Sequence, residues 1–255
     1  MQDANERLKI LDMWVDPLTR DEALERVNRF LNHGTRPHAV FASNPEKNFS
    51  VPADAGLHDV YRYADILLPD GIGMVLAARI LYGRHFLRIP GSEFIFDICR
   101  LAAREGHGIF VYGAQEEVNA KACRILGERF PGLRIAGRAN GYVKEGEMAE
   151  LVRQINDSGA KVLFIALGSP KQEKWFAAHK GSLKNVRVCQ CIGGTLDTIT
   201  GRVKRAPEIW CRHNAEWLYR LLSEPKRLKR QKVLPLFAVL VMIEKLKGFF
   251  KAART

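Results

Sequence analysis

The sequence predicts an α/β fold, a doubly wound and mostly parallel Rossmann-like sheet with a basic helical appendage at its C-terminal end. Segments typical of strands and of helices alternate along the first 200 residues. The strand-like segments are continuously apolar, which suits strands buried on both faces of a parallel sheet. After Gly201 the composition changes, and Lys and Arg become frequent. We therefore expect an α/β body of residues 1–200 and an appendage of residues 201–255.

Short apolar runs mark the expected strands. The runs at residues 108–112 and 162–167 are the clearest, because each is uninterrupted and is followed directly by a glycine. The other segments expected to form strands are residues 8–15, 38–42, 66–68 and 186–192.

Helices are expected between these strands, where apolar residues recur every three or four positions. Residues 19–31 are the first example, with Leu24, Val27 and Leu31 on one face. The alternation of strand and helix is typical of βαβ units, from which doubly wound sheets are built. The other helices expected in the body are residues 93–104, 116–129, 146–156 and 170–178.

The appendage is expected to contain a helix over residues 206–222, which Pro225 ends, and then an apolar run over residues 233–243. This run has 11 residues, whereas a membrane-spanning helix needs about 20. We expect it to lie in a membrane interface, with Lys and Arg at the head groups. An ordinary helix that packs on the body or on a second subunit is the alternative.

Net charge is concentrated in the appendage. The chain carries a net charge of +12, and residues 201–255 hold 14 Lys and Arg against four acidic residues. Such a tail indicates an acidic partner, whether phosphate, anionic lipid or nucleic acid. Few aromatic residues interleave with the basic cluster at residues 226–232, so we expect no nucleic-acid partner.

Several common sites are missing from the sequence. It contains no Gly-x-Gly-x-x-Gly fingerprint and no P-loop, which weighs against an oxidoreductase or an NTPase. No Asp-x-Asp occurs, the usual metal clamp for sugar nucleotides. Cys189 and Cys191 lack a second Cys or His pair at ligand spacing, so we expect both to be buried apolar residues.

Four polar clusters follow expected strands, where ligands bind in doubly wound folds. They are residues 43–46, 69–73, 112–115 and 168–173.

Asp70 has two interpretations. As part of an Asp-Gly turn, its carboxylate would cap the helix that begins at Ile72. At the edge of a sheet, beside glycine-opened space, the carboxylate could instead accept a proton from an attacking hydroxyl.

The polar cluster at residues 168–173 fits a capping box, with Ser169 as N-cap and Gln172 at N3. The same helix N-terminus would bind phosphate or a sugar oxygen, with charge added by Lys171. Arg88 precedes a helix that we expect Ser92 to cap. Its guanidinium could remain solvated or could clamp a diphosphate.

Taken together, these motifs resemble one family, the WecG/TagA/CpsF glycosyltransferases of bacterial surface-polymer synthesis. The resemblance covers residues 8–232. Its most specific strings are the later ones. The matching strings are NPE at 44–46, PDGIG at 69–73, Arg88 with Gly91, GSPKQE at 168–173, GGTLD at 193–197, GRVKRAP at 201–207, EWLYRLL at 216–222, and Glu224-Pro225 with Arg227.

The resemblance implies an inverting transferase that moves a sugar from a UDP-sugar donor to a saccharide on a polyprenyl diphosphate lipid. It implies a peripheral enzyme on the cytoplasmic face of the bacterial inner membrane, without an essential metal, and we expect no other cofactor. Known donors carry glucose, N-acetylmannosamine or its uronic acid. A homo-oligomer remains possible. The alternative is a nucleotide- or nucleic-acid-binding α/β protein with a basic tail.

The resemblance also assigns site residues. Asp70 matches the proposed general base. Ala42 stands where some members carry Thr, which puts one pocket contact in question. We add Lys171 and Asp197, from the matching strings, to the substrate-binding candidates. The other residues implied to bind substrate are Asn44, Arg88 and Gln172 in the pocket, and Arg220, Arg227 and Arg230 in the appendage, over the diphosphate.

Overall fold

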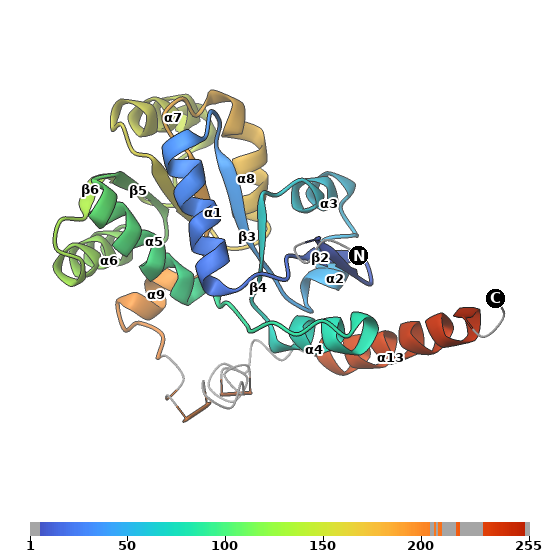
Figure 1. The fold of residues 1–255 in the computed structure, drawn as a ribbon. Helices are drawn as coiled ribbons and strands as arrows, with labels where there is room; N and C mark the ends of the chain where they lie inside the picture. The colour runs from blue at the N-terminus through green and yellow to red at the C-terminus, as the bar shows by residue number, and fades with distance from the viewer. Residues whose placement is uncertain (1–5, 205–206, 208, 211–217, 220–231, 253–255) are drawn as a thin grey trace.

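A parallel sheet forms the centre of the molecule (Figure 1). The computed structural model describes residues 6–204, 207, 209, 210, 218, 219 and 232–252. Within this part of the chain, a six-stranded sheet has the order β4-β3-β8-β7-β5-β6, and every neighbouring pair is parallel. The predicted doubly wound class is confirmed. The strands are β3 (His38–Ser43), β4 (Ile66–Pro69), β5 (Gly108–Gly113), β6 (Arg134–Ala139), β7 (Val162–Ala166) and β8 (Val188–Cys191).

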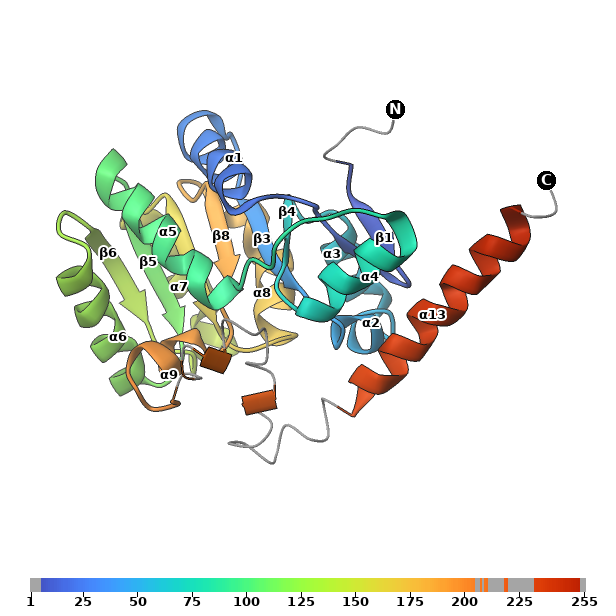
Figure 2. The same cartoon turned by 60° about the horizontal axis from the view of Figure 1, so that its bottom comes forward.

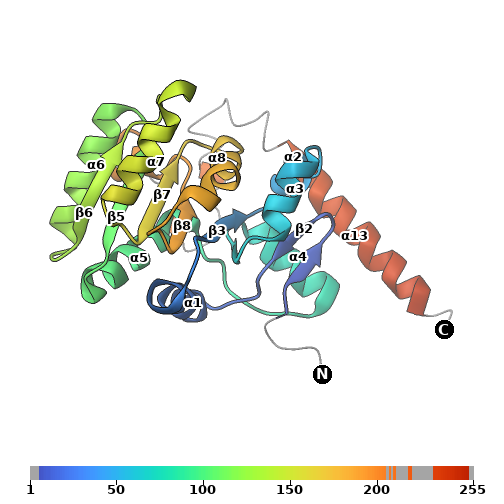
Figure 3. The ribbon, with the colours of Figure 1, turned by 90° about the horizontal axis from the view of Figure 1, so that it is seen from above.

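Helices cover both faces of this sheet and create two apolar cores. On one face lie α1 (Arg20–His33), α5 (Gly91–Glu105) and α6 (Glu116–Arg129). On the other lie α3 (Ala55–Arg62), α7 (Met148–Asp157) and α8 (Lys171–His179). Figure 3 shows α1 and α5 across the sheet from α7 and α8. Successive strand residues point to opposite faces, so Phe41 enters one core and Val40 the other.

The N-terminal segment differs from the single strand predicted over residues 8–15. It forms a hairpin of β1 (Leu8–Ile10) and β2 (Met13–Val15), which pair antiparallel. Leu11 has a φ of 54°, so the chain reverses at Leu11 and Asp12. Apolar residues on both sides of a tight turn gave the appearance of one continuous strand.

The N-cap residues of α1 and α5 test two predicted helix starts. Thr19 accepts from the backbone N–H of Glu22 in a full capping box, and α1 begins at Arg20. The expected cap at Ser92 is wrong, because α5 begins two residues earlier than expected, at Gly91, with Pro90 as its N-cap. Ser92 therefore lies inside the helix.

Some elements were not predicted. Strand β6 is half-buried and carries Arg134 and Arg138, so it lacks the continuous apolar run of the inner strands. Helices that the apolar pattern also missed are α3 and the shorter α2 (Lys47–Ser50), η2 (Lys180–Ser182) and α9 (Thr195–Ile199). The turn η1 (Glu145–Glu147) lies at the start of the helix expected over residues 146–156.

The apolar run of the appendage belongs to a longer helix, α13 (Val233–Ala252). Its first half packs against α4 (Ile72–Tyr82), and Phe237 and Val241 are buried in the core on that side. Its second half extends away from the body (Figure 2). The helix expected over residues 206–222 falls largely outside the described residues, and the boundary near Gly201 remains a prediction. Among the described residues, no helix combines the length and apolar character needed to cross a bilayer.

Candidate active site

A cavity of about 820 Å³ lies at the carboxyl ends of β3, β4 and β8. Three of the four polar clusters that follow strands contribute to its wall, as expected for a doubly wound sheet. The fourth cluster, residues 112–115, does not line the cavity. It follows β5, which lies beyond β7 and two strands from β8. All four clusters thus lie at the carboxyl edge of the sheet, as expected, and three of them line the cavity.

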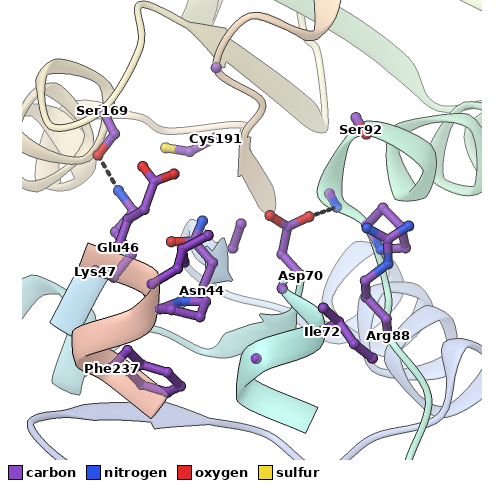
Figure 4. Close-up of a pocket in the computed structure, with 18 of the residues that line it drawn as sticks. Asn44, Glu46, Lys47, Asp70, Ile72, Arg88, Ser92, Ser169, Cys191 and Phe237 are labelled. Atoms are coloured by element: carbon purple, nitrogen blue, oxygen red, sulfur yellow. Dashed lines mark hydrogen bonds between the residues drawn. The ribbon is translucent and has the colours of Figure 1, made fainter. Parts of the chain in front are cut away.

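Asp70 lies at the end of β4 and faces the cavity (Figure 4). The expected cap on the helix beginning at Ile72 is wrong, because Gly71 is the N-cap of α4 and no side chain bonds to that end. The carboxylate instead accepts a hydrogen bond of 2.9 Å from the backbone N–H of Gly91, the first residue of α5. This bond orients one carboxylate oxygen at the cavity wall.

Two glycines bring Asn44 close to Asp70. A Cβ atom at Gly71 would lie 2.8 Å from Cδ of Pro45 and 3.1 Å from Cβ of Asn44. At Gly73 it would lie 2.5 Å from Cγ of Pro45. Only glycine allows the loop after β3 to approach the start of α4 this closely. The spacing of the PDGIG string is thus explained by the close contact of two cavity walls.

Asn44 lines the cavity and carries a hydrogen-bond acceptor that is unpaired in the described part of the chain. Its Oδ1 atom is buried and has no hydrogen-bond partner among the described residues. Because buried polar atoms are almost always paired, such an atom beside a cavity is suited to a hydroxyl or amide of a ligand.

Gln172 also lines the cavity, but the capping box predicted for its helix is wrong. The N-cap of α8 is Pro170, without a side-chain bond. The Gln172 side chain accepts from the backbone N–H of Gly193 at 2.9 Å and donates to Glu173 at 3.3 Å. The Ser169 hydroxyl accepts from Lys47. These tertiary partners replace the local cap and connect α8 to the loop after β8.

The other predicted residues divide into three groups. Arg88 lines the cavity on the side of Asp70 and Ile72 (Figure 4), and Asp197 lines it from α9, 3.9 Å from Nε of Arg202. Lys171 is exposed at the start of α8 and is not among the described lining residues. Outside the described residues lie Arg220, Arg227 and Arg230.

A buried charged cluster under the cavity was not predicted. Lys47 and Glu173 are 8% and 2% exposed, and Nζ of Lys47 lies 3.5 Å from Oε1 of Glu173. Tyr61 donates to the same oxygen at 2.9 Å. Burial, and next the Glu173 carboxylate, raise the pKa of Tyr61 well above its usual value, so Tyr61 remains a donor. Charged residues are mostly exposed, and the only signal in the sequence was that Glu173 belongs to one strand-end cluster and Lys47 directly follows another.

The predicted burial of the two neighbouring cysteines is confirmed. Cys189 and Cys191 are both free and buried, and Cys191 reaches the cavity wall. Burial, followed by the neighbouring Cys189 and Glu173, raises the pKa of the Cys191 thiol well above its usual value. A thiol held in this neutral form is a poor nucleophile and a poor metal ligand.

The arrangement is suited to acid–base chemistry on a polar ligand. One oriented carboxylate, two amide side chains and a guanidinium face a common cavity, and a carboxylate so placed can accept a proton from a hydroxyl. In the part of the chain that the structure describes, no group of three or more His, Cys, Asp or Glu is placed to hold a metal ion.

Comparison with known proteins identifies the family. The sequence model of the "Glycosyl transferase WecG/TagA/CpsF family" matches residues 8–250. A relative from Bacillus subtilis (strain 168), an N-acetylglucosaminyldiphosphoundecaprenol N-acetyl-beta-D-mannosaminyltransferase, is 34% identical over 201 residues, 79% of this chain and 77% of the relative. A protein of the same name from Bacillus spizizenii is 34% identical over 204 residues, 80% of this chain and 78% of the relative. With a match over nearly its whole length and a cavity that gathers the PDGIG and GSPKQE strings, the chain belongs to the WecG/TagA/CpsF family of glycosyl transferases.

Proposed function

We propose that this chain transfers a sugar from a UDP-sugar to a saccharide carried on a polyprenyl diphosphate, in the synthesis of a bacterial cell-surface polymer. The observation that carries this proposal is the oriented Asp70 carboxylate, which shares one cavity with Asn44, Arg88 and Gln172. The names of the two Bacillus relatives favour N-acetylmannosamine as the donor sugar and an N-acetylglucosaminyl diphosphate lipid as the acceptor.

The proposed reaction is a single inverting displacement. The acceptor hydroxyl attacks the anomeric carbon of the donor sugar from the face opposite UDP, and its proton passes to the Asp70 carboxylate. The carbon–oxygen bond to UDP breaks, and UDP leaves with the electron pair. Stabilisation of the leaving diphosphate falls to Arg88, the N-terminus of α8 and the arginines of the appendage. The Gly91 N–H holds the carboxylate in place throughout.

A panel of UDP-sugars tests this proposal. The full chain is incubated with UDP-N-acetylmannosamine, its uronic acid or UDP-glucose, and with N-acetylglucosaminyl diphosphate on a short lipid. With UDP-N-acetylmannosamine, mass spectrometry of the acceptor should show the addition of one N-acetylhexosamine residue. If no UDP-sugar changes the mass of the acceptor, the proposed function is wrong.

We expect sugar transfer to continue at an unchanged rate in EDTA. The motivation is the lack of an Asp-x-Asp motif in the sequence, together with a donor set of amides and a guanidinium around Asp70. The rate is measured with and without chelator, and then after addition of Mg²⁺ or Mn²⁺. Loss of activity in EDTA with recovery on either metal would contradict a mechanism based on arginine.

We also propose that the chain binds the cytoplasmic face of the membrane peripherally through the distal half of α13. There Leu246, Phe249 and Phe250 are exposed beside Lys245 and Lys247, a combination suited to an interface. Each basic residue near an anionic surface contributes about 1 kcal/mol.

This proposal predicts that the chain floats with anionic liposomes and is released as salt rises. Phe249→Gln should weaken flotation. Tyr142→Gln is the matched control, because the rings of Phe249 and Tyr142 are 69% and 70% exposed, and Tyr142 lies in the loop after β6. Equal flotation of the two variants would assign membrane binding elsewhere.

A further inference from the structure

The cavity that contains Asp70 has an apolar end between α4 and α13. Its walls there are formed by Leu76, Ala77 and Ile80 of α4 and by Phe237, Val241 and Met242 of α13. Phe237 and Val241 are buried where the two helices pack. Leu76, Ile80 and Met242 remain substantially exposed at the opening. We call this end of the cavity the α4/α13 groove.

The groove is continuous with the polar end. Both ends belong to one cavity, and they meet at Gly73, whose Cβ position would lie 3.5 Å from the ring of Phe237 and against Pro45. Figure 4 shows Phe237 below Asn44 and Lys47, on the same side of the cavity. A ligand at Asp70 can therefore extend into apolar surroundings without leaving the cavity.

We propose that the α4/α13 groove binds the first isoprene units of the acceptor's polyprenyl chain. This inference rests on the proposed function, in which the acceptor has a polar sugar diphosphate joined to an apolar chain. The two ends of the cavity match these two parts in polarity and in order. From Gly73 to Ile80 the α4 wall is about 10 Å long, so the groove holds only the beginning of the chain, and the remainder stays in the bilayer.

Other occupants fit the groove less well. A bilayer or a second copy of the chain would contact the outward face of α13, where Leu236 and Val239 are exposed and do not line the cavity. The lining residues instead surround a depression that leads to Asp70. A lipid chain that is covalently attached to a substrate bound at Asp70 has to leave the cavity through this depression.

Binding of isoprenyl diphosphates to the full chain tests the proposal without detergent or membrane. Isopentenyl, geranyl and farnesyl diphosphate carry one, two and three isoprene units on the same diphosphate head group. Burial of each CH₂ group is equivalent to about a fourfold gain in affinity, so titration calorimetry should show affinity rising at least tenfold from isopentenyl to farnesyl diphosphate. Equal affinities for the three compounds would overturn the proposal.

A matched pair of double variants locates the binding. Leu76→Gln with Ile80→Gln makes the groove polar, and these side chains are 49% and 36% exposed. Leu236→Gln with Ile243→Gln changes residues of the same types, 48% and 42% exposed, that do not line the cavity. In the first double variant the affinity should no longer rise with the length of the isoprenyl chain, and in the second it should rise as in the wild type. Equal losses in both would show binding to the outer surface of α13 and would overturn the proposal.

Transfer assays separate this inference from the proposed function. If sugar is transferred to acceptors of every chain length with the same KM, the groove proposal fails and the proposed function stands. If affinity rises with chain length and depends on Leu76 and Ile80, but no UDP-sugar is used, the groove stands and the proposed function fails.

Discussion

Replacing Asp70 by Asn should leave the fold intact and reduce the rate of sugar transfer by roughly 10²–10⁴-fold, the usual effect of removing a general base. The amide keeps an oxygen that can accept the hydrogen bond from Gly91, so the contact between β4 and α5 survives. It cannot take up the proton of the acceptor hydroxyl. The measurement is kcat at saturating acceptor, with thermal unfolding as the check on the fold.

Asp197→Asn is the control for this variant, because Asp197 is a second carboxylate at the cavity wall. Because we propose that Asp197 binds substrate, its replacement should affect KM more than kcat. Near wild-type turnover of Asp70→Asn at saturating acceptor would show that Asp70 serves only to hold the start of α5.

Lys47→Met should lower the free energy of unfolding by about 3–5 kcal/mol, the usual cost of removing one partner from a buried ion pair. The change leaves the Glu173 carboxylate, only 2% exposed, without its cation. The double variant Lys47→Met with Glu173→Gln removes both charges and should recover most of the loss. Urea denaturation of the three proteins provides the free energies.

Arg153→Met serves as the control for the buried pair. Arg153 and Glu150 form an exposed pair on α7, and exposed pairs contribute little, so the change should stay within about 0.5 kcal/mol. If Lys47→Met is as stable as the wild type, the buried pair does not hold α2 against α8.

The sequence was sufficient to predict the inner strands and the residues that meet at their ends. Buried parallel strands must be apolar on both faces, so β5 and β7 stand out in the sequence. Asn44 and Asp70 follow neighbouring strands, and parallel strands end at one edge of the sheet. Their approach therefore follows from the topology. Edge strand β6 is only half-buried, so its residues need not all be apolar and its sequence lacks a continuous apolar run.

The errors arose where a distant partner decided the local structure. A capping box was predicted at Ser169 from four consecutive residues, but its hydroxyl accepts from Lys47, 122 residues away in the sequence. The Asp70 carboxylate likewise bonds to Gly91 rather than to its own turn. Local patterns describe which hydrogen bonds a side chain can make, and only the assembled fold decides among them.

The order of strands has a consequence for synthesis of the protein. Strand β3 lies between β4 and β8, and β4 follows it closely in the chain, whereas β8 is formed only by residues 188–191. At a translation rate of 5–20 residues per second, about 7–30 s separate the emergence of β3 from that of β8. During this interval one edge of β3 lacks its neighbour, and its unpaired backbone N–H and C=O groups invite association with other chains. Strand β8, which contributes to the cavity wall at its carboxyl end, is thus also the strand that covers this edge of β3 and ends its exposure in the nascent chain.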